Sequence, residues 1–106
     1  MDVLDEIRRK IRHRQYEFSK QAVDQTLIRN ISVAEVEQAI AGKSEIIEDY
    51  PHDKYGPSCL ILGFTEAGRP LHLQCSYPSR PRVKIITLYE PDPSQWTRLR
   101  VRKQGK

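Results

Sequence analysis

Two apolar segments flank a five-residue turn in the middle of the chain, and this arrangement limits the fold more than any other feature. The segments are SCLILGF and PLHLQCSY, and TEAGR joins them. Glu66 and Ala67 suit the central positions of a type I turn, and Gly68 suits the left-handed position that follows it. We therefore predict a β-hairpin in which Thr65 faces Arg69.

The turn also fixes which residues share a face of the hairpin. Side chains alternate along a strand, so residues two apart point to the same side. Counting outward from the turn pairs Cys59 with Cys75, on a face shared with leucine and isoleucine. The same count pairs Leu62 with His72 and places His72 and Gln74 on the opposite face. Polar side chains in such positions ordinarily face solvent.

Cys59 and Cys75 are the two cysteines of the chain. Their apolar face favours the interpretation that they are small buried side chains. A cross-strand disulfide and a zinc site are the alternatives. His72 lies on the other face, and no fourth ligand has the usual spacing for zinc. We expect no metal ion and no cofactor.

Capping signals divide the N-terminal part of the chain into three predicted helices. The first covers about residues 2–13 and has a basic face. Ser19 is a suitable N-cap for the second helix, in which Val23 and Leu27 are spaced i, i+4. Ser32 begins an S-x-x-E capping box at the start of the third helix.

Most of the remaining chain has the pattern of β-strands, in QYEF, EIIEDY, the two hairpin segments and VKIITLYE. Helices followed by strands indicate an α+β domain. We predict a small antiparallel β-sheet meander with two to three N-terminal helices packed on one face. The whole chain, residues 1–106, is then a single domain. After PDPSQW we expect a basic C-terminal tail, about residues 97–106.

Positive charge is grouped along the chain rather than spread evenly. Lys and Arg number 18 against 14 Asp and Glu, for a formal net charge of +4. Segregated positive charge suits a surface that binds a polyanion, and RNA is the partner we expect. The alternative is that the basic residues form solvated helix faces and a frayed tail. The three blocks are Arg8, Arg9, Lys10, Arg12 and Arg14; Arg80, Arg82 and Lys84; and Arg98, Arg100, Arg102, Lys103 and Lys106.

The sequence contains no signal for a membrane. No apolar run approaches 18 residues, and acidic residues rather than an apolar region follow Met1. We therefore expect a cytoplasmic protein with no membrane partner and with reduced thiols. The sequence is compatible with a homo-oligomer.

The polar residues of the hairpin and its neighbours include the groups that metal-independent RNA cleavage requires. Such a reaction needs a base, an acid and a cation beside the phosphate. His72 titrates near neutrality, Arg69 and Lys84 are cations, and Tyr89 could position or donate a proton. Gln74 shares the polar face with His72. Five further residues are expected to contact RNA, namely Tyr55 by stacking on a base, and Arg29, Lys54, Arg80 and Arg82.

Three stretches carry a family resemblance: EFSKQAVDQTLIRNISVAEVEQAI, KSEIIEDYP and GRPLHLQCSYPSRPRVKIITLYEPDPSQW. Together they cover about residues 16–101. They resemble an uncharacterised bacterial family that is frequent in cyanobacteria and is grouped with the RelE-like toxins. MqsR-like toxins are its nearest characterised relatives. The resemblance implies a RelE-like domain that is an mRNA endoribonuclease, the toxin of a type II toxin–antitoxin system. It also implies a cognate antitoxin related to zinc-ribbon proteins.

The resemblance also implies roles for particular residues. The GR-x-LH motif of the family corresponds to Arg69 and His72 here, its T-x-Y motif ends at Tyr89, and its helix arginine is Arg29. MqsR-like enzymes use Lys, Gln and Tyr more than His. That pattern adds Lys54 to the candidates and gives more weight to Lys84, Gln74 and Tyr89.

Gln21 departs from the family pattern, because relatives often have His at this position. If that histidine is the general base, this chain is an inactivated toxin relative. The alternative to an endoribonuclease is therefore a non-catalytic RNA-binding module.

Overall fold

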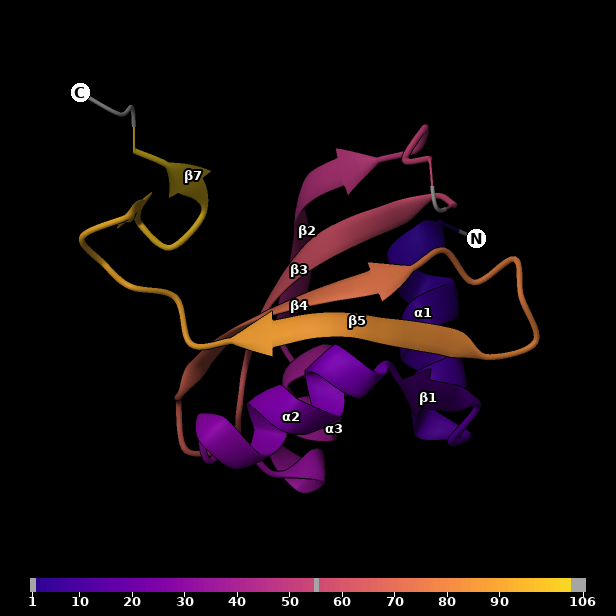
Figure 1. The fold of residues 1–106 in the computed structure, drawn as a ribbon, viewed down its shortest axis with the longest axis horizontal. Coiled ribbons are helices and arrows are strands. Elements are labelled where there is room, and N and C mark those ends of the chain that lie inside the picture. The colour runs from indigo at the N-terminus through magenta and orange to yellow at the C-terminus, as the bar shows by residue number, and fades with distance from the viewer. Residues whose placement is uncertain (1, 55, 104–106) are drawn as a thin grey trace.

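The computed structural model describes residues 2–54 and 56–103, and Figure 1 shows the arrangement of their helices and strands. No helix in these residues has both the length and the apolar character needed to cross a membrane. The elements are, in chain order, α1 (Val3–Arg12), β1 (Tyr16–Phe18), α2 (Lys20–Ile28), α3 (Val33–Ala41), β2 (Ser44–Tyr50), β3 (Ser58–Phe64), β4 (Pro70–Ser76), β5 (Val83–Tyr89), β6 (Trp96–Thr97) and β7 (Val101–Arg102).

The main sheet has five strands in the order β1-β5-β4-β3-β2. Strands β2 to β5 form the predicted antiparallel meander. Strand β1 pairs with β5 in parallel, with Tyr16 opposite Val83, so the sheet is mixed rather than antiparallel. Sequence patterns do not reveal this direction, because a long crossover through two helices and three strands separates β1 from β5.

The predicted register of the β3–β4 hairpin is confirmed. Cys59 pairs with Cys75 and Leu62 pairs with His72. Gly68 has a φ of 89°, in the left-handed region, and its N–H donates to the Thr65 carbonyl at 2.9 Å. A turn of fixed length and a side-chain period of two are sufficient to set this pairing.

The three predicted helices are present, but α2 buries a different face from the one that the sequence indicated. Val23 and Leu27 are 46% and 78% exposed, and Ala22 is the buried residue of this helix. The reason is that α2 lies along the edge of β5 beyond β1 and attaches to it through polar side chains. The Ser19 hydroxyl donates to the Ile86 carbonyl at 2.7 Å, and the Gln25 side-chain oxygen accepts from the backbone N–H of β5.

One face of the sheet forms the core with α1, α2 and α3, as predicted. Cys59 and Cys75 are fully buried in it as free thiols, which confirms their interpretation as core side chains. Burial raises the pKa of Cys59 to about 12, so its thiol stays protonated at neutral pH. Among residues 2–54 and 56–103, no group of three or more His, Cys, Asp or Glu side chains is arranged to hold a metal ion.

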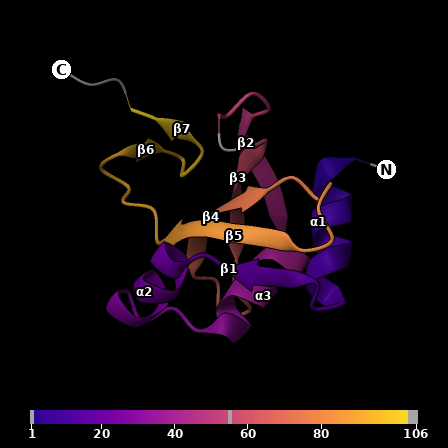
Figure 2. The ribbon, with the colours of Figure 1, turned by 45° about the vertical axis from the view of Figure 1, so that its right-hand side comes forward.

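The start of the predicted basic tail is folded. Residues 96–102, which we call the C-terminal hairpin, comprise β6, β7 and the turn between them. Figure 2 shows this hairpin set apart from the three helices, beside the sheet. Its Leu99 and Trp96 contact His72 of β4, so the hairpin covers part of the face that lies opposite the core.

Candidate functional site

His72 is fully buried beneath the C-terminal hairpin, so the expectation that it faces solvent is wrong. The Trp96 ring meets the imidazole edge-on, with 4.4 Å between ring centroids. Nε2 lies 2.7 Å from the Leu99 carbonyl, which can only accept, so Nε2 carries the proton. Nδ1 then accepts from the Tyr89 hydroxyl at 3.2 Å. Burial lowers the pKa of His72, which favours this neutral form.

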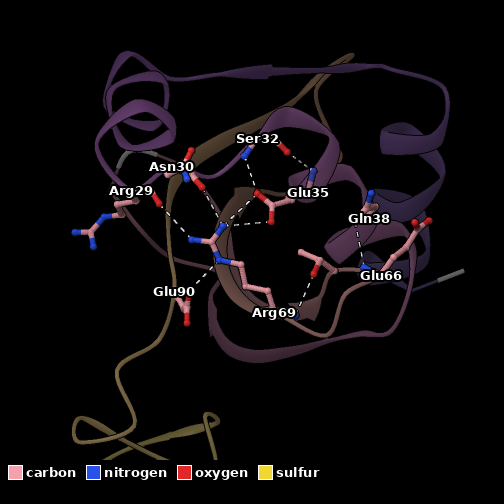
Figure 3. Close-up of polar contacts among 9 residues, drawn as sticks. Arg29, Asn30, Ser32, Glu35, Gln38, Glu66, Arg69 and Glu90 are labelled. Carbon is pink, nitrogen blue, oxygen red and sulfur yellow. Dashed lines mark hydrogen bonds and ion pairs between the residues drawn. The ribbon is translucent and has the colours of Figure 1, made fainter.

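Arg69 is also fully engaged, as Figure 3 shows. Its Nε donates to the Glu90 carboxylate at 2.8 Å, and Nη1 donates to the Glu35 carboxylate at 3.2 Å. Nη1 and Nη2 donate to the carbonyls of Asn30 and Arg29 at 3.0 and 3.2 Å. The side chain therefore ties the α2–α3 junction to the end of β5. These contacts favour a structural role over the predicted role as a cation beside the phosphate.

Replacing Arg69 with alanine should lower the free energy of unfolding by about 2 kcal/mol, the size of a lost charged hydrogen bond. The variant leaves two carboxylates and two carbonyls without their shared donor. Arg69→Lys should recover only part of the loss, because an ammonium cannot bridge four acceptors. Urea unfolding measures the effect. A stable Arg69→Ala protein with weakened RNA binding would contradict the structural role.

The other part of the outward sheet face is open. A hollow of about 460 Å³ lies there, between β4, β5, the start of α2 and the loops that follow β2 and β4. We call it the β4–β5 hollow. Its polar lining includes Gln21, Asp53, Gln74, Arg80, Lys84 and Thr87. The structure thus brings three of the predicted site residues, Gln74, Arg80 and Lys84, to one place.

A β-bulge in β5 explains how the hollow is built. Gln74 pairs with Thr87, but Cys75 pairs with Ile85, so one residue of β5 is extra. The bulge reverses the alternation, and Lys84 and Thr87 line the same hollow although they are three residues apart. The sequence did not show which way Lys84 points, because the bulge is not visible in VKIITLYE.

Hydrogen bonds fix the Gln74 amide in this hollow. Its Nε2 donates to the Ser58 hydroxyl at 3.2 Å, and its Oε1 accepts from the Thr87 hydroxyl at 3.4 Å. Across the hollow, Arg80 lies against the β2–β3 loop, where a Cβ on Gly56 would meet its guanidinium at 3.6 Å. An amide of fixed orientation and a nearby guanidinium are suitable partners for a bound anion.

A second hollow of about 560 Å³ adjoins the first. Tyr50, Pro51, His52, Asp53 and Gln74 line it. Asp53 and Gln74 belong to both hollows, so a ligand with several groups could occupy the two together.

The comparison with protein families matches residues 18–90 to the model described as a domain of unknown function, DUF4258. The chain belongs to this family. No curated protein and no solved structure matches the chain.

The DUF4258 match contains the residues that line the β4–β5 hollow and also the partners of Arg69. It ends at Glu90, before the C-terminal hairpin that covers His72. The hollow is therefore built by the family domain, whereas the cover over His72 lies outside the matched residues.

The three basic blocks of this DUF4258 chain differ in how far ion pairs neutralise their charges. Arg100 and Arg102 pair with Glu45 and Glu48 of β2, at 3.0 and 2.9 Å. In the N-terminal block, Arg8 and Arg9 pair with acidic residues of their own helix. Within the part of the chain that the structure describes, no ion pair involves Arg14, Arg80, Arg82 or Lys84.

The segments that carry these four cations are neighbours in the fold. The Lys10 ammonium donates to the Pro81 carbonyl at 3.1 Å, and the Val83 N–H donates to the Gln15 carbonyl at 3.0 Å. The end of α1 therefore lies beside the loop that carries Arg80 and Arg82. Arg80 and Lys84 line the β4–β5 hollow and Arg82 lies between them in the chain, so these three residues form a basic rim beside the hollow, whereas the charge of Arg14 acts on the Tyr16 hydroxyl.

The other predicted RNA contacts lie elsewhere or are not described. Arg29 follows the C-terminal end of α2, about 12 Å along the helix from Gln21 at 1.5 Å per residue. Lys54 lies exposed in the β2–β3 loop. Tyr55 lies outside the described residues.

Proposed function

We propose that this DUF4258 domain binds single-stranded RNA in the β4–β5 hollow and cleaves it without a metal ion. One observation carries the proposal, namely that Arg80 and Lys84, two cations outside the ion pairs of the described residues, line the hollow that holds Gln74. A phosphate needs cations that carboxylates have not already neutralised. Arg100 and Arg102 do not meet this condition, because Glu45 and Glu48 pair with them.

The lining residues supply the groups for transfer of the phosphate to the neighbouring 2′-oxygen. The 2′-oxygen attacks phosphorus, the bond from phosphorus to the 5′-oxygen breaks, and a 2′,3′-cyclic phosphate and a 5′-hydroxyl end result. Asp53 accepts the proton of the 2′-hydroxyl, and Lys84 donates a proton to the leaving oxygen. Arg80 and the Gln74 amide stabilise the charge on the phosphorane oxygens.

This activity fits the toxin of a type II toxin–antitoxin system with a RelE- or MqsR-like ribonuclease domain. The proposed partner is a cognate antitoxin, related to zinc-ribbon proteins, that blocks the hollow until it is removed. Induced expression in a bacterial host should arrest growth, and co-expression of the adjacent gene should restore it. Growth that induction leaves unchanged would argue against a toxin.

A second candidate is an RNA-binding module that does not cleave. Gln21 favours it, because this residue lines the hollow and has no group that titrates. If the reaction requires a base at this position, RNA binds but stays intact.

RNA affinity should fall with salt, with a log–log slope of about −2, because the three cations of the rim each contribute about −0.7 on a single strand. Fluorescence anisotropy of a labelled oligonucleotide in EDTA measures the binding, and mapping of the RNA ends identifies the products. An affinity that does not change between low and moderate salt would exclude the rim as a phosphate site. Binding without new RNA ends would select the second candidate.

A further inference from the structure

The surface beneath the C-terminal hairpin continues the β4–β5 hollow. Gln74 and His72 occupy successive outward positions on β4, and Thr87 and Tyr89 do so on β5. Successive positions on one face are about 7 Å apart, which is close to the spacing of nucleotides in an extended strand. The open hollow and the covered surface are therefore parts of one row of polar side chains.

The C-terminal hairpin covers this row without joining the sheet. In the described residues, β6 and β7 pair with each other and form a separate two-stranded sheet. Its contacts to the main sheet include the Leu99 hydrogen bond to His72, the Trp96 ring contact and two ion pairs from Arg100 and Arg102. Because β6 and β7 make no strand pairing with the main sheet in the described residues, the hairpin can lift without breaking the main ladder.

The arginine sides of the two ion pairs are open to solvent. The Arg100 and Glu45 side chains are 43% and 48% exposed, and Arg102 is 62% exposed although its partner Glu48 is 20% exposed. Exposed pairs of this kind contribute little, and salt screens them. RNA phosphates offer the same arginines a competing set of anions.

The turn of the hairpin is strained. Arg98 and Leu99 have φ angles of 52° and 65°, in the left-handed region that non-glycine residues seldom adopt. The Arg100 N–H still closes the turn on the Thr97 carbonyl at 3.0 Å. This conformation holds the Leu99 carbonyl against His72.

We propose that RNA displaces the C-terminal hairpin and occupies the surface beneath it as a second part of its binding site. Phosphates replace Glu45 and Glu48 as the partners of Arg100 and Arg102. The exposed His72 and Tyr89 then contact the nucleotide next to the one at Gln74. This inference rests on the proposed RNA binding and adds to it a second subsite and the element that closes it.

Trp96 makes the movement measurable, because it is the only tryptophan of the chain and is 6% exposed. Titration with a single-stranded oligonucleotide should shift its emission to longer wavelength. The midpoint should equal that of RNA anisotropy. The wavelength is the quantity to follow, since bases can quench intensity without any movement of the hairpin.

A variant that neutralises both glutamates should loosen the hairpin and leaves the residues that line the β4–β5 hollow unchanged. Glu45→Gln with Glu48→Gln should shift the Trp96 emission before RNA is added and should tighten RNA binding about fivefold, the size expected from two exposed ion pairs. The matched control is Asp24→Asn with Glu66→Gln, which changes net charge equally. Both control residues are exposed and outside the ion pairs of the described chain.

Two outcomes would overturn the inference, and they differ in whether the proposed RNA binding still stands. If RNA binds the parent while the Trp96 wavelength stays constant, and the loosened variant binds like the control, the hairpin is a fixed cover and the proposed RNA binding stands. If the loosened variant shifts its emission but neither protein binds RNA, the proposed function fails together with the inference.

Discussion

Replacing Gly63 with alanine should lower the free energy of unfolding by about 3 kcal/mol, the upper part of the range for overpacked cores. Gly63 lies on the core face of β3, opposite Leu71. A Cβ at this position would lie 2.2 Å from the Ala39 carbonyl oxygen and 2.6 Å from its carbon. Both are backbone atoms of α3, so the helix has to move away from the sheet. Urea unfolding of parent and variant measures the loss.

Gly68→Ala is the matched control for this prediction. Gly68 has nothing within 4 Å of an added Cβ, but its φ is +89°. The control should cost only about 1 kcal/mol, for the left-handed conformation alone. RNA binding by the folded Gly63→Ala protein should persist, because the β4–β5 hollow lies on the other face. Equal losses for the two glycines would mean that α3 does not pack closely on β3.

The hairpin and helix starts could be predicted because local rules decide them. TEAGR sets a turn, the turn sets the pairing of Cys59 with Cys75, and the pairing assigns each residue to a face. The caps at Ser19 and Ser32 follow from a side-chain oxygen near exposed N–H groups. None of these features depends on distant parts of the chain.

The face of the sheet to which the Lys84 side chain points depends on a distant part of the chain. The β5 bulge frees the Ile86 carbonyl, which accepts from Ser19, and the next N–H beyond Thr87 donates to Gln25. Both partners come from the segment around α2, more than 60 residues earlier in the chain. A strand pattern read on its own predicts regular alternation, and so it leaves this side chain unassigned.

The sequence did not predict the burial of His72 beneath the C-terminal hairpin, and the reason is different. The turn at Arg98 and Leu99 contains neither Gly nor Asn, so local propensity predicts a tail rather than a hairpin. The signal available in the sequence was Trp96, a large apolar residue beside an otherwise basic segment. Pairing of Arg100 with Glu45, 55 residues apart, is likewise invisible to a count of charges.

Replacing Lys84 with alanine should reduce the rate of RNA cleavage by about 10²–10³-fold, the usual cost of removing one preorganised charge donor. Lys84 lines the β4–β5 hollow and is half-buried, and no ion pair in the described residues involves its ammonium. Its charge is therefore available to the phosphate. Stability should change by less than about 0.5 kcal/mol, because the side chain is not part of the core. Single-turnover cleavage of one oligonucleotide in EDTA measures the rate.

Two further variants test whether the effect depends on the location of the lysine and on its ability to donate a proton. Lys43→Ala removes an exposed lysine outside the hollow and should cleave at the parent rate. Lys84→Arg keeps the charge and should retain RNA affinity, but it should cleave slowly, because a guanidinium does not give up its proton to the leaving oxygen. An Lys84→Ala protein with the rate and affinity of the parent would remove the hollow from the mechanism. An Lys84→Arg protein that cleaves like the parent would limit Lys84 to electrostatic stabilisation and would leave the proton donor to another residue.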